Sequence, residues 1–134
     1  MILRKHPSLV LCLALAVAAL GTAHAATPAE LAAGYASQAD APAAAARGEQ
    51  FFTSKHGREW SCASCHGTPP TQGGKHAATG KPISALAPAF NPERFSDPAK
   101  VEKWFRRNCN DVVGRECSAG EKADVLAWLT TLKK

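Results

Sequence analysis

The amino-acid sequence predicts an all-α domain that is interrupted by one long loop. Two capping boxes, Thr27 with Glu30 and Ser118 with Glu121, each open a stretch whose apolar residues recur at helical spacing. Residues 67–92 are rich in Gly, Pro and Thr, which is typical of a loop. No segment of the sequence shows the alternation that predicts a β-strand.

The first and last helices of the domain are predicted by their N-terminal caps. Pro28 follows the cap Thr27 and takes the first helical position, where proline is favoured. This helix carries Leu31 and Tyr35 on one face. The last helix begins at Ser118 and presents an apolar stripe, which consists of Val125, Trp128, Leu129 and Leu132.

A second helix is expected to begin near Asp40 and to end around Gly57. Gly48 and Phe52 are four residues apart and therefore share one face of this helix. Because glycine has no side chain, we expect Gly48 to let another helix approach closely while Phe52 packs beside it. The alternative is that Gly48 is only a tolerated weak position in the helix.

A further helix is predicted after the loop, in "SDPAKVEKWFRRNC". Asp97 is placed as its N-cap and Pro98 follows at the first helical position. Four side chains at i, i+3, i+4 and i+7 then share one face of the helix, namely Val101, Trp104, Phe105 and Asn108. Asn108 is therefore a polar residue on an otherwise apolar face.

The first 25 of the 134 residues are organised like an export signal. Arg4 and Lys5 give a positive start, residues 8–20 are an apolar run, and residues 23–25 (Ala-His-Ala) form a small-residue cleavage site. The apolar run is too short to span a bilayer, which needs about 20 residues. We predict that residues 1–25 are removed and that one domain, residues 26–134, works in the periplasm without a membrane span.

The charge of the chain limits the kinds of partner. Loss of Arg4 and Lys5 with the signal leaves 14 basic and 11 acidic residues, a net charge of +3 instead of +5. The basic residues are scattered and form no stripe with interleaved aromatics, so the sequence argues against nucleic-acid binding. A small positive surplus suits transient docking with an acidic partner.

Residues 62–66, "CASCH", match the C-x-x-C-H attachment motif of c-type haem. The spacing lets the thiols of Cys62 and Cys65 add to the two vinyl groups at one edge of a porphyrin, and it places His66 under the iron as the proximal ligand. The loop of residues 67–92 would then have a haem edge to pack against. The motif therefore predicts one covalent haem c with its iron.

Three other roles are conceivable for Cys62 and Cys65, and the sequence favours none of them. A C-x-x-C redox site is expected in a βαβ setting, which the helical pattern lacks. A zinc site needs a second ligand pair at matching spacing, and Cys109 and Cys117 are eight residues apart. A disulfide between Cys62 and Cys65 would be strained. The predicted export signal, the helical pattern of the chain and the complete C-x-x-C-H motif together favour haem attachment.

The number of cysteines in the mature chain indicates how the remaining two are used. Five cysteines become four when Cys12 leaves with the signal. An exported chain enters an oxidising compartment, where an even number of cysteines is expected to be fully used. With Cys62 and Cys65 assigned to the haem motif, Cys109 and Cys117 are left to pair with each other.

The sixth coordination position of the iron has few candidate ligands. The only methionine is Met1, which is lost with the signal, so a His/Met site is excluded. His56 lies too close in sequence to Cys62 to reach the opposite haem face and is expected to be a surface or helix-end residue. His76, in the flexible loop, is a possible ligand. Lysines 75 and 81 would have to be deprotonated, which is unfavourable at neutral pH.

Asn108 is a candidate of another kind. A buried amide without partners costs about 1–3 kcal/mol, so something should satisfy it on its apolar face. It could bind the iron, or it could bond to the backbone at the helix C-terminus, since Gly114 and the segment between Cys109 and Cys117 follow soon after. The residues alone leave both possibilities open.

The whole layout resembles a known family. Gly48 and Phe52, set against Val125 and Trp128, are similar to the crossed terminal helices of class I c-type cytochromes. The stretches "AELAAGY", "GKPISALAP", "RFSDPAKVEKWFRRNCNDVVGREC" and "GEKADVLAWL" resemble the SHP-type cytochromes over essentially the whole mature chain. Residues 53–60 match nothing in that family. The resemblance implies that Asn108 is the sixth ligand and that Cys109 and Cys117 form a disulfide.

The resemblance also implies a function. An SHP-type cytochrome transfers single electrons, binds oxygen transiently and exchanges electrons with a dihaem c-type cytochrome. An amide oxygen is a hard donor that suits ferric iron better than ferrous iron, so reduction should release Asn108 and let O2, NO or CO bind. The absence of a methionine ligand on the iron should also lower the reduction potential of the haem.

Two alternative functions stay open at this point, although the electron carrier is preferred and no catalytic residue is assigned. One is a haem enzyme that reduces oxygen, peroxide or nitric oxide. It would need a distal acid–base group, for which Arg106 and Arg107 beside Asn108 are the candidates. The other is a gas sensor or store without physiological electron flow.

Overall fold

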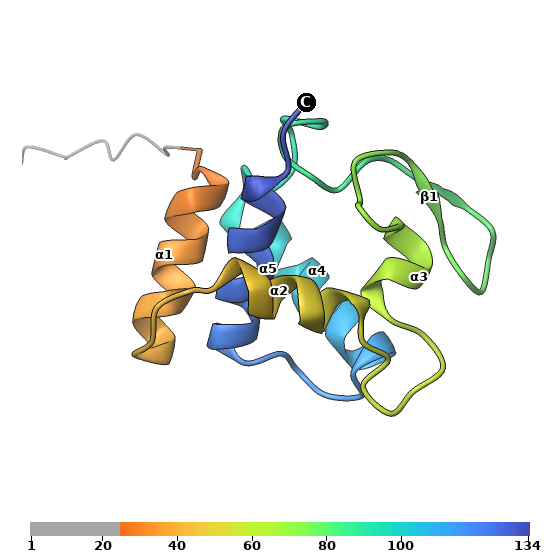
Figure 1. Ribbon diagram of the computed structural model, residues 1–134, viewed down its shortest axis with the longest axis horizontal. Coiled ribbons are helices and arrows are strands. Elements are labelled where there is room, and N and C mark those ends of the chain that lie inside the picture. The colour runs from red at the N-terminus through yellow and green to blue at the C-terminus, as the bar shows by residue number, and fades with distance from the viewer. Residues whose placement is uncertain (1–24) are drawn as a thin grey trace, which may run out of the picture.

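The computed structural model describes residues 25–134, within which the chain folds into five helices and one very small sheet (Figure 1). The elements in chain order are α1 (Pro28–Ala39), α2 (Ala45–Thr53), α3 (Cys62–His66), β1 (Gly74–Lys75), β2 (Pro82–Ile83), α4 (Pro98–Val112) and α5 (Ala119–Thr131). The all-α prediction is confirmed, and the sheet was not predicted. The expected signal, residues 1–25, lies outside the described residues except for Ala25.

Three helix starts follow the predicted caps. The hydroxyl of Thr27 accepts from the backbone N–H of Glu30 at 3.2 Å, and Ser118 and Glu121 make the same contact at the start of α5, also at 3.2 Å. A carboxylate oxygen of Asp97 accepts from the backbone N–H of Lys100 at 3.1 Å and caps α4. These helices begin where short-range hydrogen bonds satisfy their first free N–H groups.

The predicted limits of the second helix are wrong. Asp40 takes a left-handed conformation with φ 49° and ends α1 instead of opening α2. Helix α2 begins five residues later, where the backbone N–H of Ala44 donates to Asp124 of α5 at 2.6 Å. Its start is thus fixed by a carboxylate from a distant part of the chain.

Helix α5 is the centre of the domain, and α1 and α2 pack on it (Figure 1). One apolar cluster joins α1, α4 and α5 and contains Ala32, Tyr35, Val101, Ala123 and Leu126. A second joins α2 and α5 and contains Phe52, Val125, Trp128 and Leu129. The prediction for Gly48 and Phe52 is confirmed, since Gly48 touches the backbone of α5 at Asp124 and Phe52 is 1% exposed.

The predicted apolar face of α4 is only partly buried. Val101 is buried and Phe105 packs against both apolar clusters. Trp104, by contrast, is 44% exposed, and Asn108 is exposed as well. The four residues share one side of α4 as predicted, but Trp104 and Asn108 lie at the exposed margin of the buried stripe.

The loop between α3 and α4 is held in place by a few short contacts. Strands β1 and β2 are antiparallel, with Gly74 opposite Ile83. The backbone N–H groups of Leu86 and Ala87 both donate to the carbonyl of the buried Pro70, at 3.1 and 3.0 Å. The loop is thus folded back on the residues that follow the CASCH motif.

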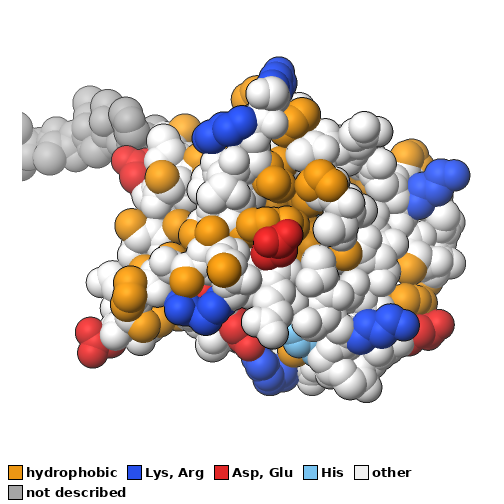
Figure 2. All heavy atoms as spheres, in the orientation of Figure 1, with side chains coloured by type: hydrophobic (Ala, Val, Ile, Leu, Met, Phe, Trp, Pro, Cys, Tyr) orange, Lys and Arg blue, Asp and Glu red, His pale blue; other side chains and the backbone are white. Residues whose placement is uncertain are grey.

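The surface carries mixed charge. In the view of Figure 2, basic and acidic side chains are scattered, and apolar side chains gather between α5 and α3. No helix within residues 25–134 is long and apolar enough to cross a membrane.

Candidate haem site

The CASCH motif forms the short helix α3. Ser61 is buried and serves as the N-cap, and its backbone N–H donates to the hydroxyl of Ser64 at 3.0 Å. One helical turn thereby places Cys62, Cys65 and His66 in a fixed relation to each other. Residues Cys62 and Ala63 pack against the second apolar cluster, which seats α3 on the crossing of α2 and α5.

His66 lies in an apolar environment. Its ring centroid is 6.2 Å from that of Phe52, and the centroid of Phe52 is in turn 5.0 Å from that of Trp128, with the two rings tilted. Burial, together with the positive charge of Arg94, lowers the pKa of His66 to about 4. Its Nδ1 atom is buried and has no hydrogen-bond partner within residues 25–134. His66 is therefore neutral at physiological pH, which is the form that binds metals.

The two thiols of the motif are not joined to each other. The structure thus does not support the alternative of a Cys62–Cys65 disulfide. Burial raises the pKa of Cys62 to about 11. The sulfur of Cys65 accepts a hydrogen bond from the backbone N–H of Ala77 at 3.2 Å.

In the part of the chain that the structure describes, no three His, Cys, Asp or Glu side chains are arranged to hold a metal ion by themselves.

These residues fit a covalent haem. Two thiols and a neutral, desolvated imidazole stand on one helical turn, which is the donor set that thioether attachment and proximal ligation require. Gly74 lies against the carbonyl oxygen of Cys65, so β1 closes over the outer side of α3. Arg94 fixes the rest of the loop by donating to the carbonyl oxygens of Ala85 and Ser84, both at 3.0 Å.

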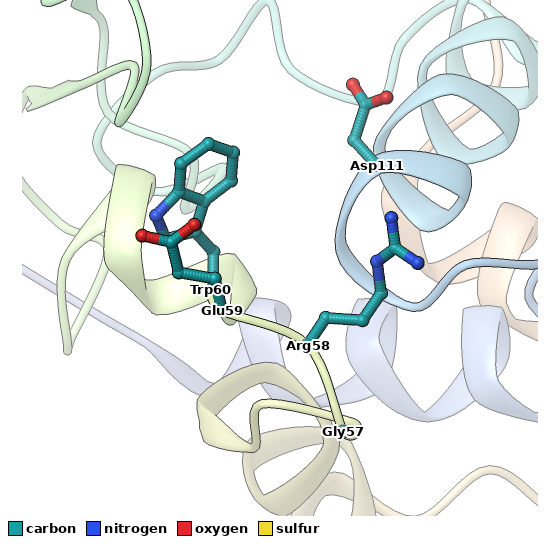
Figure 3. A pocket seen from close by; sticks show the side chains of 5 residues that line it. All are labelled: Gly57, Arg58, Glu59, Trp60 and Asp111. Carbon is teal, nitrogen blue, oxygen red and sulfur yellow. The ribbon is translucent and has the colours of Figure 1, made fainter.

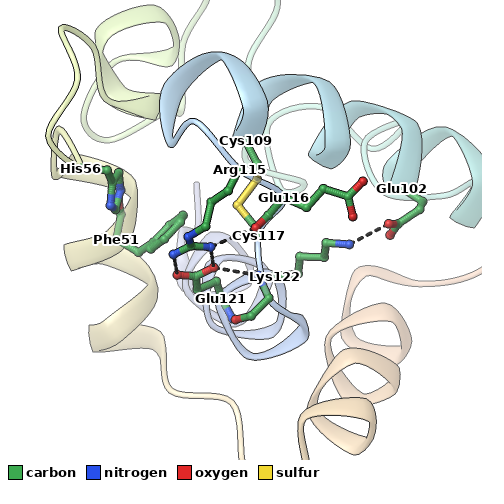
Figure 4. The surroundings of a disulfide bond; sticks show 10 residues. Phe51, His56, Glu102, Cys109, Arg115, Glu116, Cys117, Glu121 and Lys122 are labelled. Atoms are coloured by element: carbon green, nitrogen blue, oxygen red, sulfur yellow. Dashed lines mark hydrogen bonds and ion pairs between the residues drawn. A yellow bond between two sulfur atoms is a disulfide. The ribbon is translucent and has the colours of Figure 1, made fainter.

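Asn108 stands on α4, whose Phe105 packs against the same apolar cluster as Cys62 and Ala63. The Asn108 side chain is exposed and makes no hydrogen bond within residues 25–134. The alternative in which this side chain bonds to the backbone at the helix end is thus not seen. The next residue, Cys109, forms a disulfide with Cys117 with a Cα–Cα distance of 5.7 Å (Figure 4).

The other candidate ligands are engaged in local structure. His56 donates from Nε2 to the carbonyl oxygen of Phe51 at 2.7 Å, and its ring lies tilted against that of Phe51 with the centroids 4.3 Å apart. It is a helix-end residue, as predicted. His76 lies in the turn between β1 and β2, where its Nδ1 accepts from the backbone N–H of Thr79 at 3.3 Å. Lys75 and Lys81 are exposed.

The two arginines beside Asn108 are also occupied. Arg106 forms an ion pair with Glu116 at 3.4 Å, and the guanidinium of Arg107 lies 5.6 Å from the ring centroid of Trp104. These contacts therefore give no support to Arg106 or Arg107 as an acid–base group for catalysis.

A pocket of about 290 Å³ lies between the segment before α3 and the last turn of α4 (Figure 3). Its lining includes Arg58 and Trp60 from the connection between α2 and α3, and Asp111 from the opposite side. Asp111 is three residues beyond Asn108, so the two share a face of α4. Sequence reasoning missed this pocket because residues far apart in the chain form it.

The chain is similar to known proteins over most of its described length. A family model described as "Domain of unknown function (DUF1924)" matches residues 38–129. The cytochrome c-type protein SHP of Cereibacter sphaeroides is 52% identical over 107 residues, which are 77% of this chain and 82% of that protein.

Two solved structures are similar over most of their length. The structure of oxidised SHP, described as an oxygen-binding cytochrome c, has a TM-score of 0.74 at 50% identity, and the match covers 79% of this chain and 97% of that chain. The solution structure of cytochrome c'' from Methylophilus methylotrophus has a TM-score of 0.71 at 38% identity and covers 80% and 94%. The chain therefore belongs to the DUF1924 family and, like SHP and cytochrome c'', is a class I c-type cytochrome with covalently bound haem c and its iron.

Proposed function

We propose that the chain is an exported, periplasmic one-electron carrier that also binds small gases when it is reduced. In this proposal Cys62 and Cys65 hold the haem, His66 is the proximal ligand and Asn108 is a weak sixth ligand. When bound, the haem supplies one-electron redox chemistry and an iron that can bind diatomic gases. Export would make Ala26 the first residue of the mature protein, which N-terminal sequencing tests.

The observation that carries the proposal is that the Asn108 side chain is exposed and unbonded within residues 25–134. Its amide is free of hydrogen bonds within residues 25–134, and it stands three residues after Phe105, which packs on the cluster that also seats Cys62. Because an amide oxygen is a hard donor, Asn108 is expected to bind oxidised iron more tightly than reduced iron. Its release on reduction would admit O2, NO or CO.

The relatives support this behaviour. SHP is described as oxygen-binding, and the solution structure of cytochrome c'' is described as bearing on haem-ligand detachment. A dihaem c-type cytochrome is the proposed redox partner. The net charge of +3 that we predict for the mature domain would favour an acidic docking surface on that partner.

The role of Asn108 can be tested by azide binding to the ferric protein. Asn108→Ala is expected to raise azide affinity, because no side chain then competes for the iron. Asn110→Ala is the matched control, since Asn110 is an exposed amide on the same helix. If His76→Ala raised the affinity while Asn108→Ala behaved like wild type, His76 would be the ligand and the proposal would be wrong.

A further inference from the structure

Helix α4 is fastened to the N-terminal end of α5 at two points. One is the Cys109–Cys117 disulfide, in which both residues are buried. The other is Glu102, whose Oε1 accepts from Nζ of Lys122 at 2.6 Å (Figure 4). The second carboxylate oxygen of Glu102 accepts from the hydroxyl of Tyr35 in α1 at 2.7 Å.

The contacts of Glu102 belong to a closed group of four side chains, which we call the Glu102 clamp and which consists of Tyr35, Glu102, Phe105 and Lys122. Lys122 is only 8% exposed, and its ammonium lies 5.3 Å from the ring centroid of Tyr35 and 6.0 Å from that of Phe105. The two rings meet edge to face at 6.0 Å. The clamp therefore joins α1, α4 and α5 through directional contacts.

Stability alone does not explain such a clamp. Taking the ammonium of Lys122 out of water costs free energy, which its partly exposed partner Glu102 only offsets, and well-packed apolar side chains in the same place often stabilise a fold equally well or better. What the charged pair adds over apolar packing is direction. Glu102 must point at both Lys122 and Tyr35, so the clamp fixes the rotation of α4 about its own axis.

That rotation determines where Asn108 points. Successive residues of an α-helix are turned by about 100°. On α4, Val101, Phe105 and Cys109 form the buried stripe, with Glu102 at one margin and Asn108 at the other. A rotation that breaks the contacts of Glu102 would therefore carry Asn108 around the helix axis as well.

We infer that the Glu102 clamp is a positioning device for Asn108, which holds its amide in the orientation that binds the haem iron. The inference rests on the proposed role of Asn108 as sixth ligand. Tyr35, Glu102 and Lys122 are thus positioning residues, which act on the iron only through Asn108. Loosening the clamp should lower the fraction of molecules with Asn108 bound and so favour an added ligand.

The test uses the ferric holoprotein and azide as the competing ligand. Tyr35→Phe keeps the ring packing and removes only the hydrogen bond to Glu102, and it is expected to raise azide affinity about fivefold, the factor that corresponds to about 1 kcal/mol. Glu102→Gln should raise it further. Tyr35→Phe carries the test if Glu102→Gln folds poorly with Lys122 left unpaired.

The matched control is Arg47→Met, which removes an ion pair between α2 and α5, Arg47 with Asp124 at 2.7 Å, and leaves α4 untouched. It should lower the melting temperature without changing azide affinity. Amide hydrogen exchange provides a second readout. Residues 98–112 should exchange faster in Tyr35→Phe than in Arg47→Met.

A double-mutant cycle separates this inference from the proposal it rests on. In an Asn108→Ala background, Tyr35→Phe should have no further effect on azide affinity, because the residue it positions is gone. If Asn108→Ala raises the affinity but Tyr35→Phe acts like Arg47→Met, the clamp is only structural and the inference fails. If Asn108→Ala itself leaves the affinity unchanged, the proposed ligand and the clamp both fail.

Discussion

Gly48 of α2 lies in direct contact with the carbonyl oxygen of Asp124 in α5, and no side chain fits between them. This contact sets the distance between the two helices that carry Phe52 and Trp128, on which α3 is seated. The position of the haem-binding motif thus depends on a residue without a side chain in the helix that precedes the motif.

Gly48→Ala is expected to lower the free energy of unfolding by about 3 kcal/mol, because the new methyl group would overlap the backbone of α5. The measurement is chemical unfolding of the holoprotein, followed by circular dichroism. Gly34→Ala is the matched control, since Gly34 is exposed in α1 with nothing within 4 Å of the new methyl group. That change should stabilise by about 0.5–1 kcal/mol. Equal effects at both positions would show that α2 and α5 are not in close contact.

The assignment of the haem cysteines predicts a difference in haem extraction. Haem should stay with the polypeptide in acidified organic solvent in wild type and in the single variants Cys62→Ala and Cys65→Ala, because one thioether bond suffices. The double variant should lose its haem. A Cys109→Ser, Cys117→Ser protein should retain it, and haem loss from that control would contradict the assignment of the four cysteines.

Removal of the disulfide is expected to cost stability. Cys109 and Cys117 are eight residues apart, and a loop of this size contributes roughly 2–3 kcal/mol through the lower entropy of the unfolded chain. The double serine variant should therefore unfold at lower denaturant concentration than wild type. Unchanged stability, with the disulfide verified by mass spectrometry in wild type, would rule out a stabilising role.

Stability should depend on pH through Glu102. The hydrogen bonds from Lys122 and then from Tyr35 lower the pKa of this carboxyl below its ordinary value of 4.5. The ionised form is thus favoured by folding, so its contribution is present above pH 4.5 and is lost as the pH falls through the lower value of the folded state. The stability gap between wild type and Glu102→Gln should be widest near neutral pH and shrink in acid. A gap that stays constant from neutral to acid pH would contradict this account.

The parts of the fold that local sequence determines were predictable. Thr27, Asp97 and Ser118 cap helices through hydrogen bonds that span three residues, so a single sequence reveals them. The start of α2 depends on Asp124, 80 residues away from Ala44, and local pattern placed it five residues too early. The short strands were missed for the same reason, since their pairing depends on how the loop packs.

The candidate site was predictable to a similar extent. The spacing of Cys62, Cys65 and His66 identifies the attachment motif without any structure, whereas Asn108 needed the resemblance to a family. Sequence pattern placed Trp104 on the same helix face as the buried Val101, but helical spacing alone does not show where the buried stripe ends. The Glu102 clamp could not be predicted, because its members come from three helices.

The most direct test of the account is the visible spectrum of the holoprotein reduced without oxygen, recorded before and after carbon monoxide is added. We predict a high-spin ferrous spectrum that shifts when carbon monoxide binds, because Asn108 has left the iron. A low-spin spectrum that does not respond to carbon monoxide would show that a strong sixth ligand remains bound, and the proposal of a releasable Asn108 would be contradicted.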